Sequence, residues 1–271
     1  MKRMLSMLRK ALETRGLALH PSKCKVQTNV VDTPICGDTY IEEGFSVEVL
    51  APGDNLVLLG TVLSLTDVSH AEIKNRIAAG WRLFWSLKLL LLNRKSSIAR
   101  RLRLFDSTVG SCATWCCESW APRVEELRQL ESARRSMLRK IVGVVRHQDE
   151  DWVDWIQRAT HKSLNWAVRA GVRVWSDLHF EKKWMWAGHV ARRSTDTWLH
   201  RVTMWRDSAW QNIASEMNGS RELRPSKRRW MKWENPLRRF CSTSDLLPWT
   251  VLAANREQWA EYACVFRVWS T

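Results

Sequence analysis

Apolar residues recur at three- and four-residue steps over most of the chain, a spacing that predicts a mainly helical protein. In the longest such run the apolar positions are Ile73, Ile77, Trp81, Phe84, Leu87 and Leu91. Ser69 and Glu72, just ahead of this run, match a capping box, in which a serine and a glutamate three residues later bond free backbone amides. We therefore expect one long amphipathic helix that Ser69 caps.

Two further helices are predicted directly after this one. The second would be capped by Ser96 or Ser97, and the third would open at Pro122 and end near Gly143. Their inward apolar positions are Leu102, Phe105, Val109 and Cys112 in the second helix, and Val124, Leu127, Leu130, Met137, Leu138 and Ile141 in the third. Three amphipathic helices with short breaks are typical of a bundle, which we place at residues 65–146.

The first 64 residues have a different pattern and are expected to form a small α+β region. Lys2 to Arg15 has helical spacing and stops before Gly16. Residues 27–55 combine short apolar runs with Asp, Gly, Pro and Thr, as hairpin strands do. Residues 56–63 are predicted to form one more short strand. Gly60 within it indicates a bulge or a place where the backbone is approached closely.

The rest of the chain is predicted to be helical and rich in tryptophan. Nine of the 18 tryptophans lie between residues 149 and 215, which is why we expect large aromatic side chains to fill its core. A helical connection region is placed at 147–217, and a basic linker with C-terminal helices at 218–271. The fold class is therefore mainly α, with a small α+β region, a three-helix bundle and a Trp-rich helical C-terminal region.

Positive charge is concentrated after residue 70. The chain holds 43 Lys and Arg against 28 Asp and Glu, a formal net charge of +15. Residues 71–140 contain 15 basic and 6 acidic side chains, whereas residues 1–70 contain 7 and 8. Such a surplus predicts an anionic partner, most often RNA or DNA, and the alternative is an ordinary solvated basic surface.

Secretion, membrane insertion and metal binding are not expected. Residues 1–10 lack the apolar core of a signal peptide, and no 18-residue apolar stretch occurs, so we expect an intracellular protein of the nucleus or cytoplasm, not secreted and without a membrane partner. The seven cysteines fit reduced thiols better than a disulfide scaffold. Cys112, Cys116 and Cys117 lack the second ligand pair of a zinc finger, so no metal site is predicted.

Several local motifs follow one another in a recognisable order. The first part of the chain contains Leu12–Val26, with Gly16-Leu17 and then Pro21-Ser22-Lys23, and Leu58–Ser64, with its Leu59-Gly60 step. The middle contains Glu72–Trp81, Arg101–Asp106, Cys117-Glu118-Ser119-Trp120 and Leu138–Val144. The last part contains Trp186–Arg192, Trp230–Pro236 and Trp249–Trp259. In this order they resemble the LINE-type (non-LTR) retrotransposon reverse transcriptases over nearly the whole chain.

The resemblance implies the C-terminal portion of an RNA-directed DNA polymerase. Residues 1–64 would be a palm remnant with a primer-grip-like strand, and residues 65–146 a three-helix thumb. The family binds two Mg²⁺ ions on aspartates, one of them in a Tyr-x-Asp-Asp turn, but the sequence has no such turn and would start just after it. We therefore expect no catalytic residues and no cofactor in this chain. Mg²⁺ would belong to the complete polymerase, with palm and fingers of the same polyprotein as partners.

Lys23 is the one candidate for direct chemistry. The resemblance places it where a family lysine approaches the outgoing pyrophosphate as a general acid, a role that would be vestigial here, and Lys25 is the neighbouring alternative. The residues expected to hold a template–primer duplex are Leu59 and Gly60 of the grip and the cations Lys74, Arg82, Lys88, Arg94, Lys95, Arg100, Arg101 and Arg103. Cations on such helices would follow the phosphates.

A second basic stretch lies in the predicted linker. Lys227, Arg228 and Arg229 stand next to Trp230 and Trp233, a pair of rings that would stack on unpaired bases. His189, within Trp-Ala-Gly-His-Val, is expected to be a hydrogen-bonded structural histidine rather than a ligand or base.

Two other interpretations of the whole chain remain open. One is a pseudogene-derived or domesticated basic helical module that binds RNA or a protein partner, and the other is a protein-interaction scaffold. If the resemblance holds, the strands of residues 1–64 would lack their sheet neighbours, so we expect this region to be poorly ordered or partner-dependent when the chain is alone.

Overall fold

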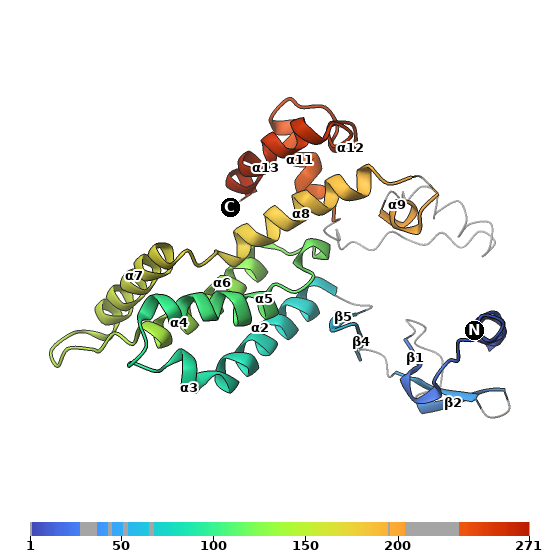
Figure 1. Cartoon of the computed structure of the whole chain (residues 1–271), viewed down its shortest axis with the longest axis horizontal. Coiled ribbons are helices and arrows are strands. Elements are labelled where there is room, and N and C mark those ends of the chain that lie inside the picture. Colours follow the sequence, from blue (N-terminus) through green and yellow to red (C-terminus); the bar gives the residue numbers. More distant parts are fainter. Residues whose placement is uncertain are drawn as a thin grey trace. The chain divides into compact units, whose positions relative to one another are not determined.

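The computed structural model describes residues 2–27, 37–42, 45–50, 54–64, 68–194, 196–203 and 233–270 (Figure 1). The prediction of a mainly α fold with a small α+β region is confirmed. The chain divides into two compact units, Met1–Asn75 and Arg76–Thr271. The division falls inside a helix, α2 (Val68–Ser86). The division into four segments at 1–64, 65–146, 147–217 and 218–271 stays a prediction.

The first unit has a small three-stranded sheet covered by short elements. Helix α1 (Lys2–Glu13), the 3-10 turn η1 (Pro21–Lys23) and strand β1 (Lys25–Val26) precede β2 (Gly37–Glu42) and β3 (Phe45–Val49). The order is β1-β3-β2, with β1 parallel and β2 antiparallel to β3. Val47 is fully buried there against Leu5, Leu19, Cys24 and Val26. A core this small stabilises the unit only modestly.

The segment predicted as one strand with a bulge is a hairpin, and the strand prediction was wrong. Strands β4 (Leu56–Leu58) and β5 (Thr61–Leu63) pair antiparallel across a two-residue turn. Leu59 and Gly60 have φ of 50° and 80°, the left-handed backbone that a tight hairpin turn requires. The predicted capping box also differs, because α2 begins at Val68 and so Ser69 is not its cap. The Glu72 carboxylate instead accepts a hydrogen bond from the Val62 amide of the hairpin.

The second unit begins with the predicted helical bundle. After α2 come α3 (Lys88–Leu91), α4 (Ile98–Phe105), the π-helical turn η2 (Asp106–Gly110), α5 (Ser111–Ala113), the 3-10 turn η3 (Cys117–Ser119) and α6 (Val124–Val142). The Ser97 hydroxyl caps α4 by accepting from the Arg100 amide at 3.4 Å, and Gly143 ends α6 with a φ of 66°, both as predicted. Fully buried core residues include Phe84, Leu91, Leu102, Phe105, Leu130 and Met137.

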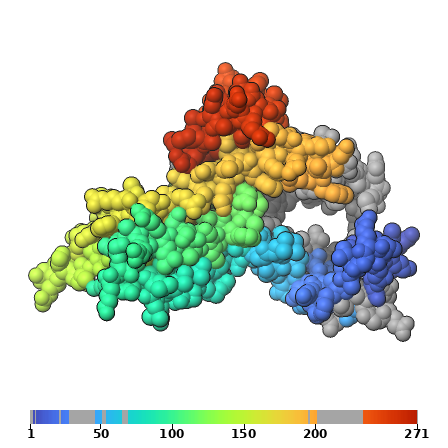
Figure 2. Space-filling model, in the orientation of Figure 1, coloured from blue at the N-terminus to red at the C-terminus, as the bar shows by residue number. Residues whose placement is uncertain are grey.

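Six helices follow the bundle in the described part of the chain. They are α7 (Trp152–Ala170), α8 (Trp175–Ala191), α9 (Trp198–Thr203), α11 (Asn235–Thr243), α12 (Trp249–Leu252) and α13 (Arg256–Ser270). Aromatic rings pack four of them, α8, α11, α12 and α13, on one another, whereas α7 lies against α4 and α6. Figure 2 shows the C-terminal helices, in red, seated on α8. No helix in the described ranges is both long and apolar enough to cross a membrane.

Two tryptophans hold α8 and α13 together. The rings of Trp184 and Trp259 stack with centroids 3.6 Å apart and an interplanar angle of 3°. Each indole N–H donates to the other residue's carbonyl oxygen, at 2.8 Å and 3.0 Å. Gly188 leaves room for the Trp259 ring, since a Cβ there would lie 2.4 Å from Nε1. The motif around Gly188 is therefore explained by close packing, while His189 is exposed and accepts from Arg193 Nε at 3.1 Å.

The turn around η3, between α5 and α6, is hydrogen-bonded to side chains of the later helices and of Trp233. Three of its backbone carbonyls, those of Cys117, Glu118 and Trp120, accept side-chain hydrogen bonds from elsewhere in the unit. His179 Nδ1 donates to Cys117 at 2.7 Å, Trp233 Nε1 donates to Glu118 at 2.6 Å, and the Lys183 ammonium donates to Trp120.

Candidate nucleic-acid interface

The segment from α2 to α4 is an uninterrupted run of positive charge. Between Ile73 and Phe105 the sequence holds nine Lys and Arg residues and no carboxylate. Seven of them are exposed: Lys74, which belongs to the first unit, and six in the second unit. These six, here called the α2–α4 cation set, are Arg82, Lys88, Arg94, Lys95, Arg100 and Arg103. Within the part of the chain that the structure describes, none of the six forms an ion pair, so their charges face solvent.

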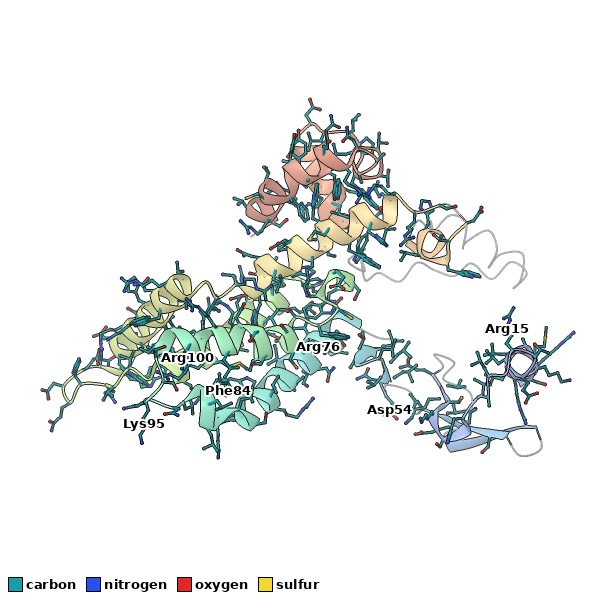
Figure 3. The ribbon with its side chains drawn as sticks, viewed as in Figure 1. Arg15, Asp54, Arg76, Phe84, Lys95 and Arg100 are labelled. Carbon is teal, nitrogen blue, oxygen red and sulfur yellow. The ribbon has the colours of Figure 1, made fainter. Side chains whose placement is uncertain are left out.

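Local geometry holds several of these cations in place. Lys95 lies in the short loop before α4, where its amide donates to the Asn93 side chain at 3.0 Å (Figure 3). Arg100 and Arg103 lie three residues apart on α4, so their side chains leave the helix on neighbouring positions. Arg94 reaches the end of α6, where its guanidinium lies beside Gly143.

Arg101 does not belong to this surface, contrary to the sequence-based prediction. Its side chain is 5% exposed, and its guanidinium donates to the carbonyl oxygens of Leu91, at 3.2 Å, and Ile141. Burial, and then the neighbouring charge of Arg94, lower the pKa of Arg101. Arg101 therefore ties α3, α4 and α6 together and cannot also reach a phosphate.

Sequence reasoning missed Lys140 near the end of α6. Its ammonium lies 5.4 Å from the ring centre of Trp85, which is itself 46% exposed on α2. Such a cation–π contact keeps the ammonium beside the helix that carries Arg82. The contact joins α6 to α2, so no local spacing in the sequence indicates that Lys140 lies beside Trp85.

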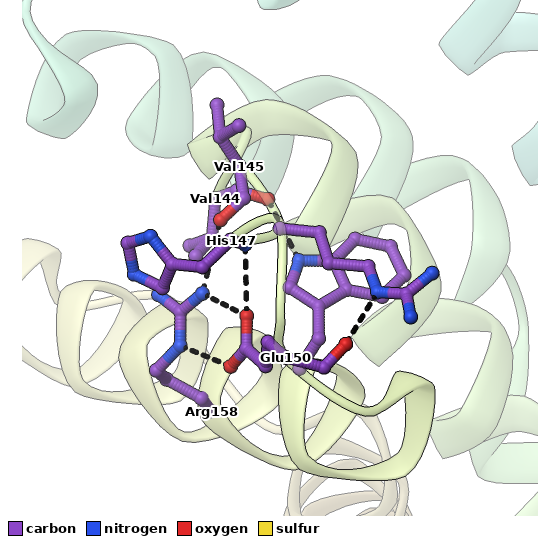
Figure 4. Close-up of polar contacts among 7 residues, drawn as sticks. Val144, Val145, His147, Glu150 and Arg158 are labelled. Carbon is purple, nitrogen blue, oxygen red and sulfur yellow. Dashed lines mark hydrogen bonds and ion pairs between the residues drawn. The ribbon is translucent and has the colours of Figure 1, made fainter.

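A network of hydrogen bonds holds the loop between α6 and α7 (Figure 4). Arg158 donates to the two Glu150 oxygens, at 2.7 Å and 2.6 Å, and also to the Val145 carbonyl at 3.0 Å. Glu150 additionally accepts from the His147 amide at 3.1 Å. These donors, Arg158 first, lower the pKa of Glu150 to about 2. Arg146, whose Nε donates to the Glu150 carbonyl at 2.9 Å, is thereby held in an exposed turn next to the end of α6.

The candidates of the first unit lie in three places. Leu59 is 88% exposed at the tip of the β4–β5 hairpin, with Gly60 beside it, and Lys74 is exposed on α2. Lys23 is exposed in η1, whereas Lys25 is paired with Glu48 across the strands at 2.7 Å. The pairing compensates the charge of Lys25, so Lys23 is the better of the two candidates for contact with a phosphate.

Trp230 and Trp233, the pair predicted to stack on unpaired bases, cannot be placed together as a pair in the structure. Lys227, Arg228, Arg229 and Trp230 lie outside the described residues. Trp233 is described and is occupied in packing: its N–H is bonded to Glu118, its ring meets Trp249 edge to face at 6.2 Å, and the Lys183 ammonium lies 5.1 Å from its centre. The stacking prediction for Trp233 was therefore wrong.

The described residues contain no group of three or more His, Cys, Asp or Glu side chains that could hold a metal ion. Cys117, the innermost of the three clustered cysteines, is buried, and burial raises the pKa of its thiol to about 12. A thiol of this kind is inert as a nucleophile and a poor metal ligand.

Comparison with known proteins shows similarity to a transposon-derived protein. No family model matches the chain, and no solved structure matches it significantly. A putative uncharacterized transposon-derived protein of Caenorhabditis elegans is 27% identical over 254 residues, which cover 90% of this chain and 81% of the relative. The similarity extends through both units, and it indicates that the chain is related to a transposon-derived protein.

Proposed function

We propose that this chain is the nucleic-acid-binding C-terminal part of a LINE-type RNA-directed DNA polymerase and that its helical bundle grips the template–primer duplex. The observation that carries the proposal is the α2–α4 cation set, six exposed cations in a segment without any carboxylate. Cations arranged in this way bind the phosphate backbone regardless of sequence, and binding releases condensed counterions. The transposon-derived relative supports the same origin.

The hydrogen bonds of Arg101, Glu150 and Arg158 explain why such a surface would be rigid. Arg101 crosslinks three helices through backbone carbonyls, and Glu150 with Arg158 fixes the following loop. Cations carried on a rigid frame lose less conformational entropy on binding than cations on a flexible tail. The exposed hairpin tip at Leu59 and Gly60 would add the contact to the primer that the family resemblance implies.

Catalysis is assigned to the complete polymerase. We expect the purified chain to extend no primer in the presence of Mg²⁺ and nucleotides, with Lys23 contributing only as a vestigial cation. Primer extension by the chain alone would contradict this assignment.

The binding surface can be tested by salt titration. Fluorescence anisotropy would follow binding of a labelled duplex to the wild type and to R100Q/R103Q over a range of salt concentrations. If both arginines contact phosphates, the slope of log affinity against log salt should fall by about 1.8, because each neutralised phosphate contributes about 0.9.

The matched control is R169Q/R256Q, which removes two exposed arginines from α7 and α13. This control keeps the wild-type slope if binding is confined to the α2–α4 cation set. Equal slopes for both double variants would instead show that attraction to the whole basic chain explains the binding.

A further inference from the structure

A cavity of about 520 Å³ opens among α6, α8, α11 and α13, and none of its lining residues belongs to the α2–α4 cation set. All of its lining residues belong to the second unit. Its volume falls in the range of small-molecule sites, roughly 300–1,000 Å³. What it would bind follows from three parts of its wall.

The first part is apolar and contains aromatic and proline rings. Phe180 from α8 and Trp269 from α13 line it, together with Pro122, Leu127 and Pro236. Aromatic and proline rings of this kind suit a planar, weakly polar body, and every nucleobase has such a face.

The second part is cationic. Arg128 and Arg135 from α6 and Arg239 from α11 contribute three guanidinium groups, of which that of Arg128 is paired with Glu125 at 4.0 Å. The one lining carboxylate, Glu131, is already compensated, because it accepts from Arg134 Nε at 2.7 Å and from the Ser176 amide at 2.9 Å. The excess of cations would therefore attract an anion, and guanidinium forks match phosphate oxygens well.

The third part offers hydrogen bonds that the described residues do not fill. His179 is fully buried in the wall, and burial lowers its pKa to about 3, so its ring is neutral. Because Nδ1 donates to the Cys117 carbonyl, Nε2 of the neutral ring carries a lone pair and no proton. Neither His179 Nε2 nor the Ser270 hydroxyl has a hydrogen-bond partner among the described residues. Buried polar groups normally have partners, so two such atoms on residues that line one cavity point to a missing polar partner.

We infer that this cavity binds one unpaired nucleotide, with its base between the apolar walls and its phosphate on the arginines. His179 Nε2 would accept from an amino group of the base, and the Ser270 hydroxyl would bond the same edge. The inference stands on the cavity and does not depend on the α2–α4 cation set. The nucleotide could be free or part of a single strand, since both present the same base and phosphate.

Equilibrium dialysis of the full chain with radiolabelled adenosine monophosphate tests the inference. The wild type should show saturable binding of one nucleotide, and R135Q/R239Q should weaken it about tenfold or more, because two charge-assisted contacts are lost. R169Q/R256Q removes equal charge away from the cavity and should change affinity less than about twofold. Ala121→Trp tests the cavity by steric block: it fills the cavity without changing charge and should abolish binding while the circular dichroism spectrum stays unchanged.

Two competitors identify the ligand. Ribose 5-phosphate should compete much more weakly than the mononucleotide, since it lacks the base. A single-stranded hexaadenylate that competes at lower concentration would identify the nucleotide as part of a strand, and one that competes no better than the mononucleotide would identify free nucleotide. The inference is overturned if no saturable binding occurs, if ribose 5-phosphate competes equally well, or if both double variants lose affinity alike.

Discussion

The packing of Gly188 beneath the Trp259 ring allows a sharp prediction for Gly188→Ala. The added Cβ would lie 2.4 Å from Nε1 and 2.7 Å from Cδ1 of the ring. The ring cannot simply retreat, because it is stacked on Trp184 at 3.6 Å and its N–H is bonded to the Trp184 carbonyl. The clash must therefore be relieved by moving α13 relative to α8.

The size of the effect follows from what that movement disturbs. Overpacking in a core costs about 1–3 kcal/mol, and a lost hydrogen bond costs about 1 kcal/mol more. Alanine in place of glycine inside a helix returns about 1 kcal/mol. We therefore expect Gly188→Ala to lower the free energy of unfolding by about 1–3 kcal/mol, measured as a lower urea midpoint at unchanged slope in far-UV circular dichroism.

Gly80→Ala is the matched control. Gly80 is also buried inside a helix, but the nearest atom to its added Cβ, Ala113 Cβ, would be at an ordinary contact distance of 3.4 Å. This variant should be neutral or more stable by up to about 1 kcal/mol. Equal midpoints for Gly188→Ala and Gly80→Ala would refute the packing argument.

Three further predictions concern buried or paired charges. Arg101→Ala should destabilise the chain by about 2–4 kcal/mol in urea unfolding, because two buried carbonyls lose their donor, whereas exposed Arg103→Ala should change stability by less than about 0.5 kcal/mol; equal effects would contradict this. The pKa of Glu150 is lowered to about 2, so its ion pair with Arg158 stabilises the fold above about pH 4.5, and this stabilisation is lost as pH falls toward 2. Glu150→Gln should remove this loss of stability in acid. A Glu150 carboxylate that titrates in NMR at its ordinary pKa would contradict the prediction. Burial lowers the pKa of Lys183 from 10.5 to about 7, so the folded state binds fewer protons between these values and stability should rise with pH across that window; Lys183→Met should flatten the rise, and an unchanged slope would count against the assignment.

The helical part of the fold was predictable because its signals are local. Ser97 caps α4 and Gly143 ends α6 through bonds within three or four residues, so the sequence alone contains them. The hairpin was not recognised, because its turn uses Leu59-Gly60 in place of the usual Asn-Gly or Asp-Gly pair. A leucine at positive φ is unusual, and nothing in the apolar run indicates it.

The sequence predicts the positive charge of the candidate site but not which of its cations are buried. The run of cations from Lys74 to Arg103 is visible in the sequence, yet Arg101 looks the same there as Arg100 and Arg103. Its acceptors belong to residues 10 and 40 positions away, so only tertiary structure separates the buried arginine from its exposed neighbours. The cavity wall combines four helices in the same way, and no sequence spacing reveals it.

The turn at Cys117–Trp120 has a consequence for how the sequence can vary. Its partners His179, Lys183 and Trp233 are bonded to backbone carbonyls, which every residue type supplies. Exposed Ser119 can therefore be exchanged for other residues without disturbing these bonds. Inserting or deleting a single residue in the turn would shift all three acceptors at once. The length of this segment should therefore be far more constrained than the identities of its amino acids.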